Sequence, residues 1–180
     1  MKVEETPIEG LKIIKPTIFE DERGHFFEPY NNNTFKEHGI TVNFVQDNQS
    51  LSQANVLRGL HFQKPPHDQG KLVRVVKGRV LDVAVDIRSN SNTYGKYVAI
   101  ELSESNKISF FIPSGFAHGF LTLEDNTIFE YKCTNFYNKN SEGTILWNDP
   151  QLTIDWKIAN PLLSDKDKLG ESFENFISPF

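Results

Sequence analysis

The sequence is nearly without cysteine and has no long apolar run. Cys133 is the only cysteine among 180 residues, so no disulfide can form within the chain. No stretch approaches the roughly 18 apolar residues of a membrane helix, and Met1 to Gly10 lack the apolar core of a signal peptide. We therefore expect a cytoplasmic protein that contacts no membrane, with a single domain over residues 1–180 held by its hydrophobic core.

Positive charge is also scarce. The chain has 19 Lys and Arg against 24 Asp and Glu, which gives a formal net charge of −5, and the basic residues form no cluster. Nucleic-acid binding depends on clustered Lys and Arg, so we expect no nucleic-acid partner. A few well-placed arginines and lysines would still suffice to hold one diphosphate.

The sequence does contain a series of short β-rich runs. Two of them, Leu72–Val76 and Val80–Ile87, flank Lys77-Gly78-Arg79 and predict a hairpin. The further runs are Tyr97–Leu102, Ile108–Ile112, Gly119–Leu123 and Ile128–Cys133. Short strands at this spacing favour an antiparallel sandwich or barrel over alternating βα units. The mouth or lumen of such a domain is the expected ligand site.

Helix signals are few. Asn33 or Thr34 is the expected N-cap of a short helix that runs through His38 and stops at Gly39. Near the end, Ser164-Asp-Lys-Asp167 resembles a capping box with an acidic residue at the third helical position. The sequence therefore predicts an all-β domain with a few short helices.

Two of the five histidines lie in segments that could form a site. His61 lies in an apolar segment three residues after Arg58, and strand alternation would place it on the same face as Gln63. His118 immediately precedes an apolar strand. Taken singly, each is explained as a core histidine bonded to the backbone, but two histidines entering separate strands of one β domain favour a functional site.

A metal site is the first interpretation to test. The pattern Pro113-x-Gly115-x-x-His118 looks like the second metal-binding motif of the cupin superfamily. The first cupin motif normally supplies His-x-His and a later Glu, but here the stretch is His61-Phe62-Gln63 and no Glu follows before Gly70. Lys71 would put a cation where the metal should sit. We therefore predict a cupin-like barrel without a metal, and a metal-dependent cupin such as an oxygenase is the alternative.

Without a metal, these side chains suit proton abstraction beside a carbonyl. A neutral imidazole, with an ordinary pKa of about 6.5, is a suitable base near neutral pH. Lys71 would hold the oxygen on which enolate charge develops, and Tyr131 would return a proton from the other face. Ordinary roles stay open here, with Lys71 as a solvated strand residue and Tyr131 as a core ring. A non-catalytic sugar-binding sandwich is a further alternative.

Longer motifs run in order over nearly the whole chain. They are Phe19–Gly24, Phe44–Asn48, Val56–His61, Gln69–Arg74, Leu81–Asp86, Ile112–Phe120, Glu130–Lys132, Trp147–Pro150 and Leu163–Asp167. With them the chain closely resembles the dTDP-4-dehydrorhamnose 3,5-epimerase family. The resemblance implies a cupin-like antiparallel jelly-roll barrel or sandwich. It also implies a cofactor-free homodimer that epimerises dTDP-4-dehydro-6-deoxy-D-glucose at C3 and C5, making the precursor of dTDP-L-rhamnose.

The resemblance also implies roles for individual residues. His61 is the general base, Asp167 its dyad partner, Tyr131 the proton donor and Lys71 the enolate stabiliser. Residues expected to contact the sugar or the nucleotide are Arg58, His118, Arg23, Glu28, Gln46, Asn48, Glu142 and Lys166. The rings of Tyr137 and Phe19 are expected to stack on the thymine, with Phe19 offered by the other subunit of the homodimer. A 3-epimerase, a 5-epimerase or a 3,4-ketoisomerase would share the scaffold, but the full set favours the double epimerase.

Overall fold

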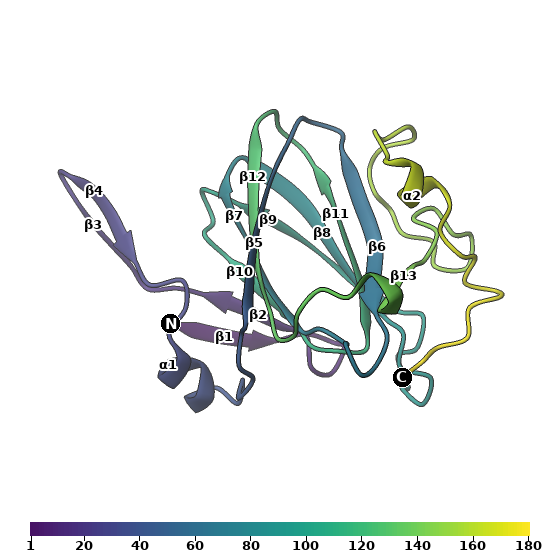
Figure 1. Cartoon of the computed structure of the whole chain (residues 1–180). Coiled ribbons are helices and arrows are strands. Elements are labelled where there is room, and N and C mark those ends of the chain that lie inside the picture. Colours follow the sequence, from purple (N-terminus) through teal and green to yellow (C-terminus); the bar gives the residue numbers. More distant parts are fainter.

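Two antiparallel β-sheets pack face to face in the computed structural model, which describes residues 1–180 (Figure 1). The first sheet has the order β1 (Lys2–Glu5), β2 (Lys12–Lys15), β10 (Ser109–Ile112), β7 (Lys71–Lys77), β12 (Thr127–Cys133) and β5 (Gln46–Ser52). The second has the order β13 (Glu142–Thr144), β6 (Leu57–Gln63), β11 (Phe116–Thr122), β8 (Arg79–Asp86) and β9 (Tyr97–Ser103). The predicted all-β antiparallel sandwich is confirmed.

The predicted hairpin at Lys77-Gly78-Arg79 is wrong. Strand β7 pairs with β10 and β12 in the first sheet, whereas β8 pairs with β11 and β9 in the second. Gly78 has a φ of +80°, and Thr127 packs where a Cβ would stand, so this glycine turns the chain sharply from one sheet into the other. Two adjacent β-rich runs thus end in facing sheets, each burying one side against the other.

Three apolar clusters hold the sandwich together. The first lies between the sheets and includes Val73 and Phe129 from one sheet with Ala84 and Phe120 from the other. The second lies on the outer face of the second sheet, where Trp156 and other residues of the C-terminal segment cover it. The third is smaller and lies beneath α1 (Asn32–Glu37), which inserts its buried Phe35. Because both faces of the second sheet are covered, its strands read as apolar runs without strict alternation.

The short helices are close to their predicted places. The N-cap of α1 is Asn31 and not Asn33 or Thr34, because the Asn31 side chain accepts hydrogen bonds from the backbone N–H groups of both. The predicted stop at Gly39 is confirmed, with a φ of +77° there. Helix α2 (Asp165–Lys168) is capped by Ser164 as predicted. A 3₁₀ turn, η1 (Lys139–Ser141), was not predicted, and no helix is long and apolar enough to cross a membrane.

A β-bulge in β6 shapes the space between the sheets. His61 pairs with His118 and Arg58 pairs with Phe120, so two residues of β6 oppose the single Gly119 of β11. Strict alternation would turn Arg58 and His61 to opposite faces, but the extra residue turns both inward. Gly59 takes a φ of +133° in the bulge, where the Gly119 backbone leaves no room for a Cβ. The sequence predicted that His118 precedes this strand, but His118 lies within β11.

One hairpin projects from the body of the molecule. Strands β3 (Ile18–Asp21) and β4 (Gly24–Phe27) pair only with each other and extend away from both sheets (Figure 1). We call residues 18–27 the arm. Two of its phenylalanine side chains are largely exposed to solvent, Phe19 at 62% and Phe26 at 69%. A two-stranded hairpin has no hydrophobic core of its own, and no other part of this chain covers these rings.

Candidate active site

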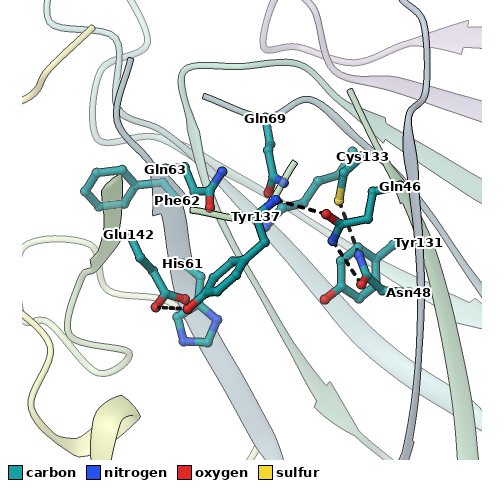
Figure 2. A pocket seen from close by; sticks show the side chains of 11 residues that line it. Gln46, Asn48, His61, Phe62, Gln63, Gln69, Tyr131, Cys133, Tyr137 and Glu142 are labelled. Atoms are coloured by element: carbon teal, nitrogen blue, oxygen red, sulfur yellow. Dashed lines mark hydrogen bonds between the residues drawn. The ribbon is translucent and has the colours of Figure 1, made fainter. Parts of the chain in front are cut away.

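A cleft between the two sheets gathers most of the predicted site residues. It consists of two adjoining hollows of about 290 and 300 Å³, which share His61, Lys71, Tyr131 and Glu142. The first hollow is also lined by the polar residues Gln46, Asn48, Gln63 and Tyr137 (Figure 2). The second is also lined by Arg58, His118, Lys166 and Asp167. Of the predicted residues, only the three on or beside the arm lie outside it. The cleft is therefore the candidate active site.

His61 is held by a buried carboxylate. Its Nε2 lies 2.6 Å from Oδ1 of Asp167, which is only 3% exposed. The same carboxylate accepts from the Ser164 hydroxyl at 2.6 Å and from the Gly59 backbone N–H at 3.3 Å. Burial alone would raise the pKa of Asp167, but the hydrogen bonds from His61 and Ser164 outweigh it and hold this pKa below its ordinary value. The carboxylate is therefore ionised at neutral pH.

This partner fixes which nitrogen of His61 is basic. An ionised carboxylate only accepts, so Nε2 carries the proton and Nδ1 offers its lone pair to the cleft. Burial lowers the pKa of His61 against the opposing hydrogen bond from Asp167, and the cations of Lys166 and Lys71 lower it further. The ring is therefore neutral and ready to accept a proton near neutral pH.

Lys71 brings a cation into the same cleft from the opposite sheet. It is the first residue of β7, pairs in register with Cys133, and has no ion-pair partner in the structure. Burial lowers its pKa, and the nearby Cys133 and Asp82 oppose the shift. An ammonium group that lacks a counter-ion inside a cleft can stabilise a substrate oxygen on which negative charge develops.

Tyr131 faces His61 across the cleft. It lies on β12 of the first sheet, whereas His61 lies on β6 of the second, and both line each of the two hollows. Burial raises the pKa of the Tyr131 hydroxyl, and Cys133 raises it further, so the phenol keeps its proton at neutral pH. The arrangement can therefore accept a proton at one wall and donate a proton from the other.

A chain of polar contacts holds a ring across the mouth of the cleft. The Tyr137 backbone N–H donates to Gln46 at 2.9 Å, and the Gln46 amide donates to Asn48 at 3.1 Å (Figure 2). The Tyr137 hydroxyl donates to Glu142 at 3.2 Å, and Glu142 also pairs with Lys166. Amides, a cation and an exposed aromatic ring make this end suitable for a nucleotide.

The arm residues lie outside the cleft. Phe19 and Arg23 belong to the arm and line a separate open hollow, and Glu28 follows β4 directly. Arg23 pairs with Asp21 at 2.5 Å. Within one chain, the fold therefore does not bring these three predicted site residues to the cleft that the other eleven line.

No three His, Cys, Asp or Glu side chains converge to hold a metal ion. Gln63, in the place of the second cupin histidine, donates its amide to the backbone oxygens of His67 and Phe136. The metal-dependent alternative therefore finds no ligand set among the residues of the cleft.

Residues 5–175 match a family model described as dTDP-4-dehydrorhamnose 3,5-epimerase. The chain belongs to this epimerase family. A curated dTDP-4-dehydrorhamnose 3,5-epimerase from Shigella flexneri is 53% identical over 174 residues, covering 96% of each chain. A solved dTDP-6-deoxy-D-glucose-3,5-epimerase from Legionella pneumophila Philadelphia 1, in complex with dTDP-4-keto-L-rhamnose, has a TM-score of 0.94 at 48% identity, covering 98% of this chain and 94% of that one.

The name of a more distant structural neighbour describes epimerisation at a single carbon. It is a 3'-monoepimerase from Streptomyces bikiniensis in complex with dTDP-quinovose, with a TM-score of 0.89 at 30% identity, covering 94% of this chain and 86% of that one. The predicted cupin-like fold and the prediction of an isomerase are confirmed by these likenesses.

In this epimerase-family chain, sequence reasoning missed one polar partner in the cleft. Asp82 on β8 is fully buried, and its two carboxylate oxygens lie 3.0 and 2.9 Å from Nε2 of His118. The available signal was an acidic residue at the centre of the β-rich run Val80–Ile87, between the apolar Leu81 and Val83. An acidic residue at an inward position of such a strand needs a partner, and the pairing of β11 with β8 supplies His118.

Proposed function

We propose that the protein is a 3,5-epimerase that converts dTDP-4-dehydro-6-deoxy-D-glucose into dTDP-4-dehydro-L-rhamnose without a cofactor. One observation carries the proposal: His61, oriented by the buried Asp167, faces Tyr131 across a cleft that also holds the unpaired cation of Lys71. The names of the relatives support the same activity, and the Legionella structure contains the corresponding 4-keto sugar nucleotide.

The first step is removal of a proton from a carbon beside the C4 ketone. The ketone acidifies the hydrogens at C5 and C3, and Nδ1 of His61 accepts one of them. The imidazolium that forms is stabilised by Asp167, which stays ionised throughout. The electron pair moves onto the ketone oxygen, where Lys71 holds the enolate charge. A preorganised donor of this kind is worth on the order of 3–4 kcal/mol.

The second step is reprotonation from the opposite face. Tyr131 donates its phenolic proton to C5, which inverts that centre because the proton left on the His61 side. A single residue acting as both base and acid would tend to restore the original configuration. Solvent then takes the proton from His61 and returns one to Tyr131, after which a second cycle of proton removal by His61 and reprotonation inverts C3. Each proton-transfer group contributes typically about 10²–10⁴-fold to the rate.

The rest of the site binds the sugar nucleotide. Arg58 and His118 contact the sugar, with His118 oriented by Asp82 as His61 is by Asp167. At the mouth, Tyr137 stacks on the thymine, and Gln46, Asn48, Glu142 and Lys166 contact the nucleotide. Planar stacking and amide hydrogen bonds suit a nucleobase, and a lysine suits its diphosphate.

The arm supplies the remaining contacts in a homodimer. The bare rings of Phe19 and Phe26 need a surface to cover them, and the arm extends beyond its own sandwich. Reaching into the cleft of the partner subunit, it would add Phe19, Arg23 and Glu28 to the nucleotide end. Each site would then be completed by two chains.

Solvent exchange tests the proposed activity. The purified protein is incubated with dTDP-4-dehydro-6-deoxy-D-glucose in D₂O, and the sugar carbons are followed by NMR. Deuterium is expected at both C3 and C5, together with the product of L-configuration. Incorporation at one carbon only would make the protein a single-centre epimerase, and none at either carbon would overturn the proposal.

A further inference from the structure

Gln63 occupies the position after His61-Phe62 but does not direct its amide at the reacting groups. It is 5% exposed, and its Nε2 donates to the backbone oxygens of His67 at 2.5 Å and Phe136 at 3.2 Å. Its Oε1 accepts from the backbone N–H of Asn138 at 2.7 Å. Both ends of the amide are therefore committed to two loops, residues 64–70 and residues 134–141, and we call the second one the mouth loop.

The neighbouring His67 extends this connection. Its Nδ1 lies 2.9 Å from the Ser141 hydroxyl, and its Nε2 lies 3.3 Å from Nδ2 of Asn138. Since an amide nitrogen donates, Nε2 is the acceptor and Nδ1 carries the proton. The Lys64 backbone N–H also donates to the Ser141 backbone carbonyl oxygen at 2.7 Å. The mouth loop is thus joined by polar contacts to Gln63 at the end of β6 and to the loop 64–70 that follows it.

The mouth loop has no apolar core to hold it. Its other contacts are also polar: Thr134 and Asn135 bond to the loop 64–70, and Tyr137 bonds to Gln46 and Glu142. It contains only the 3₁₀ turn η1 and no strand pairing, and Phe136 and Tyr137 are 64% and 56% exposed. An apolar core therefore cannot fix its position. By contrast, His61, Lys71 and Tyr131 lie on strands held by backbone ladders. Loss of the Gln63 contacts would loosen the backbone on both sides of Tyr137, at Phe136 and Asn138, and leave the catalytic groups in place.

We propose that Gln63 is a positioning residue for substrate binding: it fixes the mouth loop so that the Tyr137 ring lies over the cleft. This inference rests on the proposed function, in which Tyr137 stacks on the nucleobase. Gln63 orders the nucleotide end before the substrate arrives, which lowers the entropy lost on binding. It takes no part in the proton transfers.

The experiment compares Gln63→Met with the wild type. Methionine has a similar length but leaves the three backbone groups without their side-chain partner. The expected result is a rise in KM of about tenfold or more, with kcat changed by less than about threefold. Thymidine diphosphate, tested by calorimetry, should show a matching rise in Kd. The matched control is Gln151→Met, because Gln151 is exposed and its side chain makes no hydrogen bond. It should leave KM, kcat and Kd unchanged.

Two results would overturn the inference. One is an unchanged KM and thymidine diphosphate Kd in Gln63→Met, and the other is a fall in kcat as large as the fall in kcat/KM. Should this variant not fold, Ser141→Ala removes only the His67 contact and should raise Kd by about two- to fivefold, whereas an unchanged Kd would refute the inference. If the wild type fails to turn over the sugar nucleotide, the proposed function fails, and the calorimetry still decides the role of Gln63.

Discussion

Replacing Asp167 with asparagine probes the dyad most sharply. Asparagine keeps the size of the side chain and one acceptor oxygen, so the hydrogen bond from His61 can persist. The Ser164 hydroxyl, which donates to the carboxylate at 2.6 Å, can accept from the new amide instead. The main change is loss of a negative charge 2.6 Å from the ring nitrogen of His61.

The size of the effect follows from that charge. Opposite charges about 4 Å apart attract by about 4 kcal/mol at an effective dielectric constant near 20. This stabilisation is absent while His61 is neutral and appears when it becomes an imidazolium, so it acts on the transition state. At 1.36 kcal/mol for each factor of ten, kcat should fall by about 10³-fold. KM should change little, because the Asp167 carboxylate is already engaged by His61, Ser164 and the Gly59 backbone N–H.

The assay is kcat for epimerisation together with the rate of deuterium uptake at C5, with thermal unfolding to confirm that the variant folds. Asp165→Asn is the matched control, since Asp165 lies on the same helix with a side chain 96% exposed, and its kcat should be unchanged. A folded Asp167→Asn variant that kept kcat within about tenfold of the wild type would refute the reasoning.

Three further predictions concern the other reacting groups. Tyr131→Phe should lose C5 inversion about 10²–10⁴-fold while C5 exchange in D₂O survives better, and equal losses by NMR would remove Tyr131 from the donor role. Lys71→Met should lower kcat about 10²–10³-fold, whereas the exposed Lys77→Met should not, and equal rates for the two variants would contradict the enolate role. Because burial lowers the pKa of His61, kcat/KM should fall on the acid side with a midpoint below the ordinary histidine value of about 6.5, and a midpoint above it would argue against His61 as the base.

Most strands could be predicted from local pattern, but their pairing could not. The runs Leu72–Val76 and Val80–Ile87 correspond to β7 and β8. The glycine between them indicated a tight turn, which the structure contains. Whether such a turn joins neighbours in one sheet or crosses between two sheets depends on where the rest of the chain packs. That information is not in the local residues.

The face of β6 that lines the cleft shows the same limit. Alternation would separate Arg58 from His61, and only the bulge at Gly59 brings them together. The bulge also aims the Gly59 backbone N–H at Asp167. Glycine within a strand is a known sign of a bulge, but its position relative to the paired strand needs the register with β11.

Asp167 could not be assigned to the site by pattern alone. The sequence correctly predicted a helix start capped by Ser164, with Asp167 in its first turn. Its contact with His61 spans 106 residues of sequence, so no local spacing indicates it. The family resemblance predicted the pair, whereas the buried pair of His118 and Asp82 was found only in the structure.

The central claim is that one base, His61, serves both carbons beside the ketone. His61→Asn tests it directly, because asparagine keeps a polar side chain but cannot accept the proton. In D₂O the wild type should take up deuterium at C3 and C5, and the folded variant should take up none at either carbon on the same timescale. Exchange that persisted in the variant at one of the two carbons would contradict the claim.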